Sequence, residues 1–491
     1  MAKKLFPVEG FAPDLDTTTP GVIVDCQGMI PTTKGMEASP SPVAVGLPAL
    51  AATCTGAFAL TLLDGTSRFF ATTGTAIYEA AGVTSWTDQT RLVGGAYSGG
   101  TARWRATQYG NVSIMGTKQD VLQYSVSSGA FANITGAPQA NLIETVGDFI
   151  MVADYNDGTD TPDGVKWSAR SDYTSWTPAA ATESGAIRLV SSPGSIRGLK
   201  RLGDNVVAYK GRSMYLGTFQ PQILWGFTEV SNTVGAVSHE AVVPIVTKAG
   251  GAAHIFMGND DFYYYDGSRP VPIGSPVKTW FFQRLNDGFS DKVAALHDPV
   301  KSLIFWFYPS TSSTDGSLNA CIVYNYRADK WGVDDRDIEI PVLYISGGLT
   351  YGDLEAAYAT YGDLPAIPYD SPYWYEGSRL GAYFNRSHVL QSLAGESASS
   401  SYTTGDLGDD EQVLMLSRVR PRYQTAPDSA TMTNYYRMNL GDALTTGVTT
   451  TISDGKFDCL QSARWHRLKF DHTGDTELTA NSAEYELDGS E

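Results

Sequence analysis

Short runs of alternating apolar and polar residues follow one another along most of the chain, and turns rich in Gly and Asp separate them. The clearest copy comprises residues 57–63, a turn at Asp64 and Gly65, and a second run at 68–71 that leads to Tyr78. An Asp-Gly pair between two alternating runs is a strong signal for a β-hairpin. Because side chains of a strand point alternately to opposite faces, this pattern predicts short strands rather than amphipathic helices.

The hairpin unit recurs with a long period. By subtraction of residue numbers, its anchoring aromatic residues are 46, 43, 48, 49 and 60 positions apart; they are Tyr78, Tyr124, Trp167, Tyr215, Tyr264 and Tyr324. A period of about 40 to 50 residues is typical of β-propellers. We therefore predict an all-β fold with a β-propeller of about six blades. Two stacked β-sandwiches are the alternative, because alternation alone does not distinguish one all-β fold from another.

The composition of the chain changes along its length and predicts four regions. The propeller occupies residues 53–345, and the arm before it, 1–52, either completes a blade or packs on the C-terminal domain; the strand-like residues 22–26 are the expected closing strand. Residues 346–395 contain two copies of Thr-Tyr-Gly-Asp-Leu and many prolines, which predicts an extended connector. Further β-rich runs at 396–491 predict a small domain resembling a β-sandwich.

Acidic residues outnumber basic ones by 53 to 35, so the formal net charge is −18 at pH 7. This balance argues against a protein that reads nucleic acid, because phosphate contacts need clustered Lys and Arg. The four cysteines lie far apart and match neither a zinc site nor a disulfide framework, which favours free thiols in a reducing cytosol. The apolar stretches are too short or too interrupted for a secretory signal or for stable membrane insertion.

No catalytic, cofactor-binding or metal-binding constellation is predicted. The six histidines form no HExxH motif, and the chain contains no GxSxG elbow and no phosphate-binding glycine loop. The acidic turn at 154–164 could offer oxygen ligands to calcium, but it lacks the EF-hand spacing, and a solvated hairpin tip is the favoured interpretation. The segment 168–176 is similar to the Asp-box turn of sialidases, but it lacks the central Gly, which favours an ordinary blade turn.

Three arginines alternate along one predicted strand. Arg418, Arg420 and Arg422 would all point to the same face, where like charges repel and need acidic partners. One interpretation is a local network with the acidic residues just upstream, Asp406, Asp409, Asp410 and Glu411. The other is that the three arginines form a subunit interface.

Several soft motifs in a fixed order resemble those of bacteriophage tail nozzle proteins, also called tail hub or packaged-DNA stabilisation proteins. The resemblance covers most of the chain from about residue 100 onward. The matching segments are 165–172, 324–331, 350–354, 370–374, 404–406, 418–421, 462–467 and 483–488.

This resemblance implies a β-propeller virion protein of a short-tailed phage that is assembled in the host cytoplasm. Its copies would form a ring, a hexamer, below the portal and adaptor proteins and next to tail fibre or plug proteins. The ring would extend the DNA channel, retain packaged double-stranded DNA and serve its ejection, without catalytic residues. An acidic wall suits that task, because DNA must pass without being gripped. The alternative is a tail propeller that binds host glycan, or a diverged glycosidase.

Overall fold

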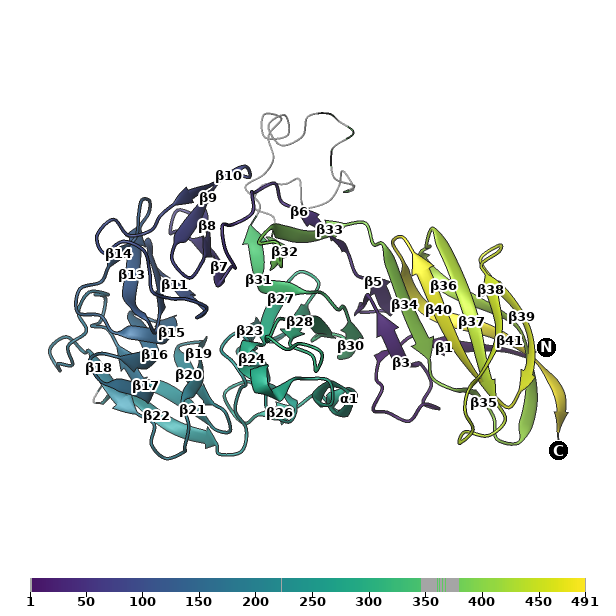
Figure 1. Cartoon of the computed structure of the whole chain (residues 1–491). Helices are drawn as coiled ribbons and strands as arrows, with labels where there is room; N and C mark the ends of the chain where they lie inside the picture. Colours follow the sequence, from purple (N-terminus) through teal and green to yellow (C-terminus); the bar gives the residue numbers. More distant parts are fainter. Residues whose placement is uncertain are drawn as a thin grey trace.

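The computed structural model describes residues 2–221, 223–345 and 379–490 and the single positions 360, 362, 364 and 367. Nearly all regular structure in these residues is β-strand (Figure 1). The helical elements among them are one α-helix, α1 (Lys278–Phe282), and one 3₁₀ helix, η1 (Asp287–Lys292). The all-β prediction is therefore confirmed. No helix in the described part of the chain is long and apolar enough to cross a lipid bilayer.

Four of the described sheets are separate blades of four antiparallel strands. The first three are β7–β10 (Gly56–Thr61, Ser67–Thr72, Ile77–Ala81, Ser85–Asp88), β19–β22 (Ile196–Leu202, Asn205–Lys210, Met214–Gln220, Leu224–Ser231) and β23–β26 (Val242–Val246, Ala252–Met257, Phe262–Tyr265, Val271–Pro272). The fourth consists of β31, β32, β33 and β6 (Ile338–Ile345, Arg379–Asn385, Leu390–Gly395, Ser41–Ala44). Each blade buries apolar side chains against its neighbours, as radial packing requires.

Three further sets of four strands belong to larger sheets. Two of them, joined by the single residue pair Val121↔Gln139, are β11–β14 (Arg105–Tyr109, Val112–Thr117, Asp120–Val126, Ala132–Asn133) and β15–β18 (Gln139–Val146, Phe149–Asn156, Asp160–Trp167, Gly185–Arg188). The third is β27–β30 (Ala294–Asp298, Leu303–Tyr308, Ala320–Asn325, Lys330–Val333). The first strands of all the sets touch in a closed cycle, β7, β11, β15, β19, β23, β27, β31 and again β7.

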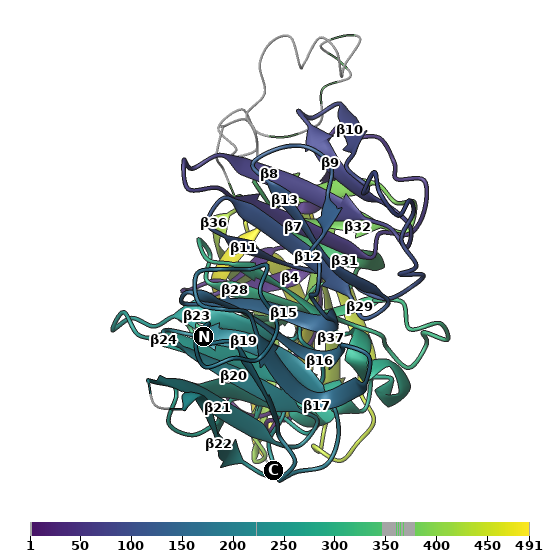
Figure 2. The ribbon, with the colours of Figure 1, turned by 90° about the vertical axis from the view of Figure 1, so that its left-hand side faces the viewer.

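This cycle confirms the β-propeller, whereas the expected count of six blades is wrong. Four blades are separate sheets, and the other three sets of strands complete the ring (Figure 1). Seen from the side away from the C-terminal domain, β15–β17 and β20–β22 lie in front (Figure 2). The six repeats visible in the sequence correspond to the six sets that are continuous in the chain. The remaining blade is split between 41–44 and 338–395, so it contributes no regular aromatic period.

The ring is closed by β6, and the expected closing strand at residues 22–26 is wrong. In β6, Pro42 and Val43 lie opposite Leu393 and Ser392 of β33 in an antiparallel pair. The strand β3 (Val22–Gln27) instead pairs with β2 (Gly10–Phe11) and β34 (Ser399–Thr404). The run at 22–26 is the more strand-like of the two in sequence, whereas β6 is only four residues long and contains Pro42, so local pattern favoured the wrong segment.

The boundary expected at residue 345 also differs from the structure. Strands β32 and β33 lie in the predicted connector, yet they belong to a propeller blade, so the propeller reaches Gly395. Both Thr-Tyr-Gly-Asp-Leu copies fall in 346–378, which lies almost entirely outside the described residues.

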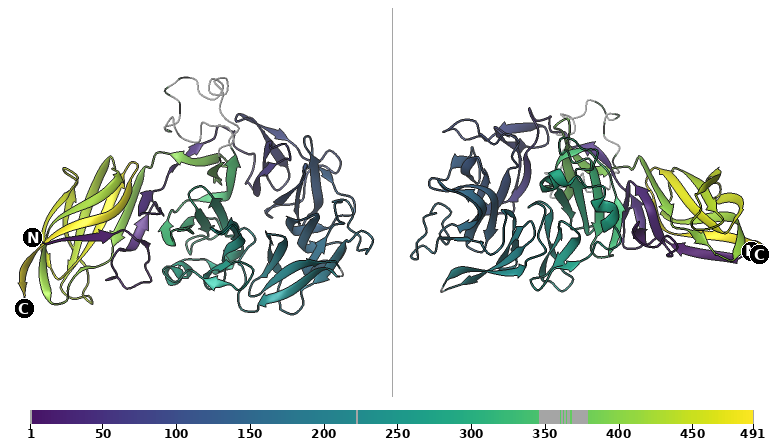
Figure 3. Two further views of the ribbon diagram at one scale, coloured as in Figure 1. Left: turned by 180° about the vertical axis from the view of Figure 1, so that it is seen from behind. Right: turned by 60° about the horizontal axis from the view of Figure 1, so that its bottom comes forward.

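Two sheets face each other in the C-terminal domain, and strands of the N-terminal arm belong to both. One sheet holds β1, β41, β36 and β39 (Ala2–Pro7, Glu477–Ser490, Gln412–Thr425, Phe457–Ala463) and continues through β5 and β4 (Met36–Ala38, Met29–Pro31) to β30. The other holds β2, β3 and β34 together with β40, β37, β38 and β35 (Trp465–Thr473, Ser429–Arg437, Thr445–Thr451, Leu407–Gly408). Both chain ends lie at the far end of this sandwich (Figure 3).

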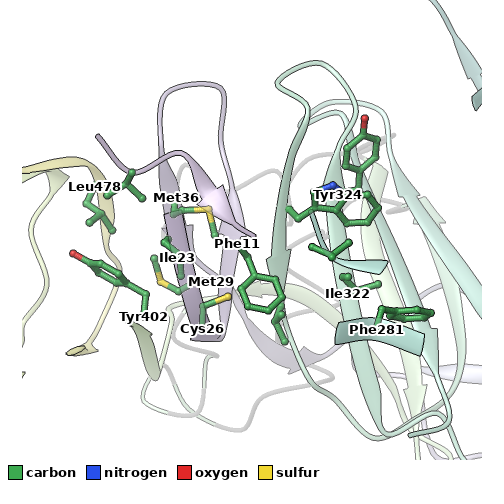
Figure 4. Packing of buried hydrophobic residues seen from close by; sticks show 14 of the residues in the cluster. Phe11, Ile23, Cys26, Met29, Met36, Phe281, Ile322, Tyr324, Tyr402 and Leu478 are labelled. Carbon is green, nitrogen blue, oxygen red and sulfur yellow. The ribbon is translucent and has the colours of Figure 1, made fainter. Parts of the chain in front are cut away.

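One apolar core connects the sandwich with the propeller. Side chains of the arm, among them the fully buried Met29 and Met36, lie between Tyr402 of the sandwich and Tyr324 of the propeller (Figure 4). Trp306 of the propeller strand β28 belongs to the same cluster. Its indole donates a hydrogen bond to the Ala241 carbonyl oxygen at 3.0 Å. The two domains are therefore joined by packed side chains and by a continuous sheet.

Candidate functional site

A cavity of about 1080 Å³ lies on the axis of the propeller. Its walls come from the first residues of the inner strands and from the loops that precede them, so it marks the mouth where the inner strands begin. The walls carry charges of both signs; the basic side chains are Arg103, Arg105, Arg197, Lys292 and Arg386, and the acidic ones are Asp154, Asp287, Asp291, Asp315 and Glu339. Such a cavity is the default binding site to consider in a fold of this kind.

Beside this cavity a buried ion-pair cluster links opposite sides of the ring. The Glu240 carboxylate, just before β23, accepts hydrogen bonds from Arg105 Nε at 2.8 Å and Nη2 at 3.2 Å. Arg103 Nη1 lies 3.6 Å from the same carboxylate. Burial alone would raise the pKa of Glu240, but the two guanidinium charges outweigh burial and hold this pKa well below its ordinary value. The cluster therefore stays ionised and fixes β11 to β23 across the cavity.

Three other carboxylates of the cavity wall are also held by hydrogen-bond donors. Asp154 accepts from Lys118 Nζ at 2.6 Å, and Asp315 accepts from Arg386 Nη2 at 3.0 Å. Glu339 accepts from His388 Nδ1 at 2.6 Å and from the Cys54 backbone N–H at 2.9 Å. The pKa of Asp315 is lowered, chiefly by hydrogen bonds from the Ser317 backbone and side chain and by Arg386. A glycosidase needs one carboxyl with a raised pKa, and Asp315 is shifted in the opposite direction.

A carboxyl with a raised pKa lies at the other mouth of the propeller. Glu144, Lys200, Arg201 and His297 line a smaller cavity of about 490 Å³ there. Burial raises the pKa of Glu144 to about 6, although the charges of Lys200 and Arg201 act in the opposite direction. This group was not singled out from the sequence, because nothing in its local pattern distinguishes it from any other strand carboxylate.

The acidic turn at 154–164 is a set of ion pairs. Lys118 Nζ lies 2.6 Å from Asp154 and 2.7 Å from Asp160, and Lys166 Nζ lies 2.7 Å from Asp157. The fourth carboxylate, Asp163, accepts two hydrogen bonds from Arg188, at 2.9 and 3.0 Å. Each of the four carboxylates thus contacts a basic side chain, with Lys118 shared by two of them, which leaves none of the four as a free calcium ligand.

We therefore expect calcium to have no effect on stability. A thermal unfolding curve recorded with excess EDTA should coincide with one recorded with added calcium. If calcium bound the native state, it would raise the unfolding midpoint. A calcium-dependent rise of several degrees would contradict this interpretation of the turn.

Among the described residues no group of three or more His, Cys, Asp and Glu side chains could hold a metal ion. All four cysteines, Cys26, Cys54, Cys321 and Cys459, are buried and unpaired. Burial raises the pKa of each thiol, to about 11 for Cys459, so these groups stay protonated at neutral pH.

The segment similar to an Asp-box forms an ordinary blade turn. The Asp172 carboxylate accepts from the backbone N–H and the hydroxyl of Thr174 at 2.9 and 2.6 Å. Trp176 is buried against the neighbouring strands, and its indole donates to the Tyr173 carbonyl oxygen at 2.8 Å.

The three alternating arginines lie on β36 in the sandwich, and only the first is paired within the described residues. Arg418 lies 2.8 Å from Asp458 of β39 and 3.6 Å from Glu484 of β41. Arg420 and Arg422 are exposed, and neither guanidinium group forms an ion pair or a hydrogen bond with a described residue. A local network therefore exists, but the acidic partners expected upstream are wrong, because β39 and β41 flank β36 in the sheet.

Asp406, one of those expected partners, is the centre of a different cluster. Its side chain is fully buried and accepts from Arg467 at 2.7 and 3.1 Å, from Arg437 Nη2 at 2.5 Å and from the Thr17 hydroxyl at 2.6 Å. These donors come from β40, β37 and the N-terminal arm. The cluster therefore locks the arm to the sandwich.

The motifs behind the family resemblance meet in these contacts. Asp406 belongs to the segment 404–406 and Arg467 to 462–467, while Arg418 belongs to 418–421 and Glu484 to 483–488. Sequence reasoning placed the motifs but not their pairing, because the partners are 61 positions apart in the first pair. The Glu240 cluster was missed altogether, since its members are 135 positions apart and follow no spacing rule.

No family model and no curated protein matches this chain. Similar solved structures include BBS1N in complex with ARL6DN, at 9% identity and a TM-score of 0.34, covering 70% of this chain and 79% of that chain. Hsv2 from Kluyvelomyces marxianus is 8% identical, with a TM-score of 0.28 and coverage of 48% and 67%. An exo-β-1,3-galactanase from Phanerochaete chrysosporium is 10% identical, with a TM-score of 0.24 and coverage of 90% and 100%. These TM-scores are low, and we base no argument on them.

Proposed function

We propose that this chain is a structural protein of a tailed phage virion. Identical copies form a hexameric ring, the tail nozzle or hub, below the portal and adaptor proteins. The ring extends the channel for double-stranded DNA, helps to retain the packaged genome, serves its ejection, and contacts tail fibre or plug proteins. The protein is assembled in the host cytoplasm and resides in the phage tail, where its role is mechanical and involves no catalysis.

The observation that carries this proposal is the pairing of the family-like motifs. Asp406 with Arg467, and Arg418 with Glu484, join strands inside the sandwich, and none of the four residues lines the axial cavity. These four residues of the family-like motifs therefore hold the C-terminal sandwich together. That role supports a building block of an assembly better than it supports an enzyme or a ligand-binding protein.

The charge of the chain supports the same proposal. A protein that grips DNA along a channel would make many phosphate contacts, and each contact adds counterion release that must be reversed before DNA moves. A subunit with a net charge of −18 presents few such contacts. DNA can then slide past without being retained by the wall.

A glycan-binding or glycan-hydrolysing propeller is the second candidate, and the axial cavity is the observation in its favour. The cavity of about 1080 Å³ has room for a small saccharide. Against hydrolysis there, Asp154, Asp315 and Glu339 are all bound by basic or backbone donors. A propeller that binds a glycan without hydrolysing it would need none of these carboxylates to be free.

Light scattering after size-exclusion chromatography tests the proposal directly. Purified protein, alone and mixed with portal rings, is expected to elute with the mass of six chains, or to co-elute with the portal. A parallel column of immobilised host cell-surface polysaccharide should not retain it. A single-chain mass under both conditions, together with retention on the polysaccharide, would favour the second candidate.

A further inference from the structure

The outer face of the β1–β41–β36–β39 sheet carries unpaired positive charge. Arg420 and Arg422 of β36 are exposed there, and within the described residues neither forms an ion pair, although the charge of Arg420 also acts on Glu484. Arg418 on the same face is already paired with Asp458 and Glu484. In a chain with an excess of acidic residues, two exposed arginines on the same face of one strand, neither of them in an ion pair, form an unusual surface.

Exposed leucines lie on the same face. Leu5 of β1 is 48% exposed and shares its face with Lys3, which pairs with Glu484 as Arg418 does. The register places Leu5 opposite Ser482, and Ser482 opposite Arg420. We call the outward side chains of Lys3, Leu5, Arg418, Arg420, Arg422 and Leu460 the arginine face.

The last member of the arginine face, Leu460 of β39, is 74% exposed. It lies two positions from Asp458, whose carboxylate contacts Arg418, so its side chain points the same way. Arginine is enriched at protein–protein interfaces, and the buried core of an interface is more apolar than its rim. The face is therefore suited to a protein partner.

A complementary surface lies at the opposite end of the same strand. Asp409, Asp410 and Glu411, immediately before β36, are all exposed and form the one run of three consecutive acidic residues in the sequence. Asp410 accepts from the Trp465 indole at 3.2 Å, while Asp409 and Glu411 have no basic partner among the residues that the structure describes. We call these three residues the acidic corner.

The two surfaces cannot neutralise each other within one subunit. Glu411 and Arg420 are nine positions apart along β36, which corresponds to about 30 Å of extended strand. Opposite charges so far apart are screened from each other at physiological salt, where the Debye length is about 8 Å. Each surface is therefore open to a partner from another molecule.

We propose that the arginine face binds the acidic corner of the next copy of this chain. The contact joins two different surfaces, so it is head-to-tail, and contacts of this kind close into rings when the rotation between neighbours permits. This inference rests on the proposed function, because that function requires a ring, and it names the surfaces that form the ring. The exposed leucines lie around the arginines and exclude water from the ion pairs.

Reciprocal charge reversal tests the contact. The variants R420E/R422E and D409K/E411K should each lose the multi-chain species in light scattering and elute with the mass of a single chain at about 0.1 M salt, where charge screening is moderate. Mixed in equal amounts, the two variants should regain the multi-chain species. The glutamates of the first variant then meet the lysines of the second, and the unchanged arginine face of the second meets the unchanged acidic corner of the first. The variant that carries all four substitutions should also assemble by itself.

The matched control is R212E/R269E, which makes the same charge change at two exposed arginines of the propeller and should assemble as the wild type does. A milder variant, R420Q/R422Q, should weaken assembly and remain folded by circular dichroism. The proposal is overturned if both reversed variants assemble like the wild type, or if neither the mixture nor the four-substitution variant restores the ring. If the wild type stays a single chain even with portal rings, the proposed function itself fails, which distinguishes the two cases.

Discussion

An Asp406→Asn variant is expected to lose about 3–5 kcal/mol of its free energy of unfolding, the usual cost of removing one partner from a buried ion pair. The Asp406 side chain is 0% exposed and is bound by Arg437 and Arg467, whose side chains are only 12% and 17% exposed. Without the carboxylate, two guanidinium groups remain in a site with little water. Urea unfolding followed by tryptophan fluorescence measures the loss.

The matched control for this variant is Asp458→Asn. Asp458 also accepts from an arginine, Arg418, but its side chain is 58% exposed, so its loss should cost less than about 1 kcal/mol. The same substitution is thus tested in a buried and in an exposed ion pair. Equal losses of unfolding free energy in the two variants would contradict the stabilising role of the buried Asp406 cluster.

A Glu240→Gln variant is expected to cost a similar amount, about 3–5 kcal/mol at pH 7. The substitution leaves Arg103 and Arg105 without their carboxylate, and these side chains are 15% and 11% exposed. The pKa of Glu240 is lower in the folded protein than its ordinary value of 4.5. Its contribution is therefore fully present above pH 4.5 and is lost as the pH falls through the lower folded pKa.

The pH dependence separates this charge effect from a loss of packing. The difference in unfolding free energy between the wild type and Glu240→Gln should be largest near neutral pH and should shrink on acidification. Glu396→Gln, at an exposed position, is the control and should change stability by less than about 0.5 kcal/mol. A Glu240→Gln difference that stays constant as the pH falls below 4.5, or that shrinks already above pH 4.5, would contradict the assigned ionisation.

The long aromatic period was sufficient to predict a propeller, because each continuous set of four strands carries its own Tyr or Trp anchor. Such a period cannot show a blade that is assembled from distant segments. The closing strand β6 is four residues long and contains Pro42, so it gives no pattern of its own. Its place becomes visible only when it pairs with β33.

The candidate sites show the same limit. Alternation correctly placed Arg418, Arg420 and Arg422 on one strand, but strand order decides which acids lie beside Arg418, and local sequence does not contain that order. Proximity in sequence suggested Asp406 as a partner of the three arginines. In the structure Asp406 is buried between β40, β37 and the arm, where it accepts hydrogen bonds from Arg467 and Arg437. Contacts between residues far apart in sequence were thus the part that could not be predicted.

Negative-stain electron microscopy of the purified protein, alone and mixed with portal rings, would show the proposed ring itself. We expect a six-fold annulus that binds below the portal and whose contacts weaken as salt is raised. A particle of single-chain size that ignores the portal, and that retains or hydrolyses host cell-surface polysaccharide, would contradict the proposed function.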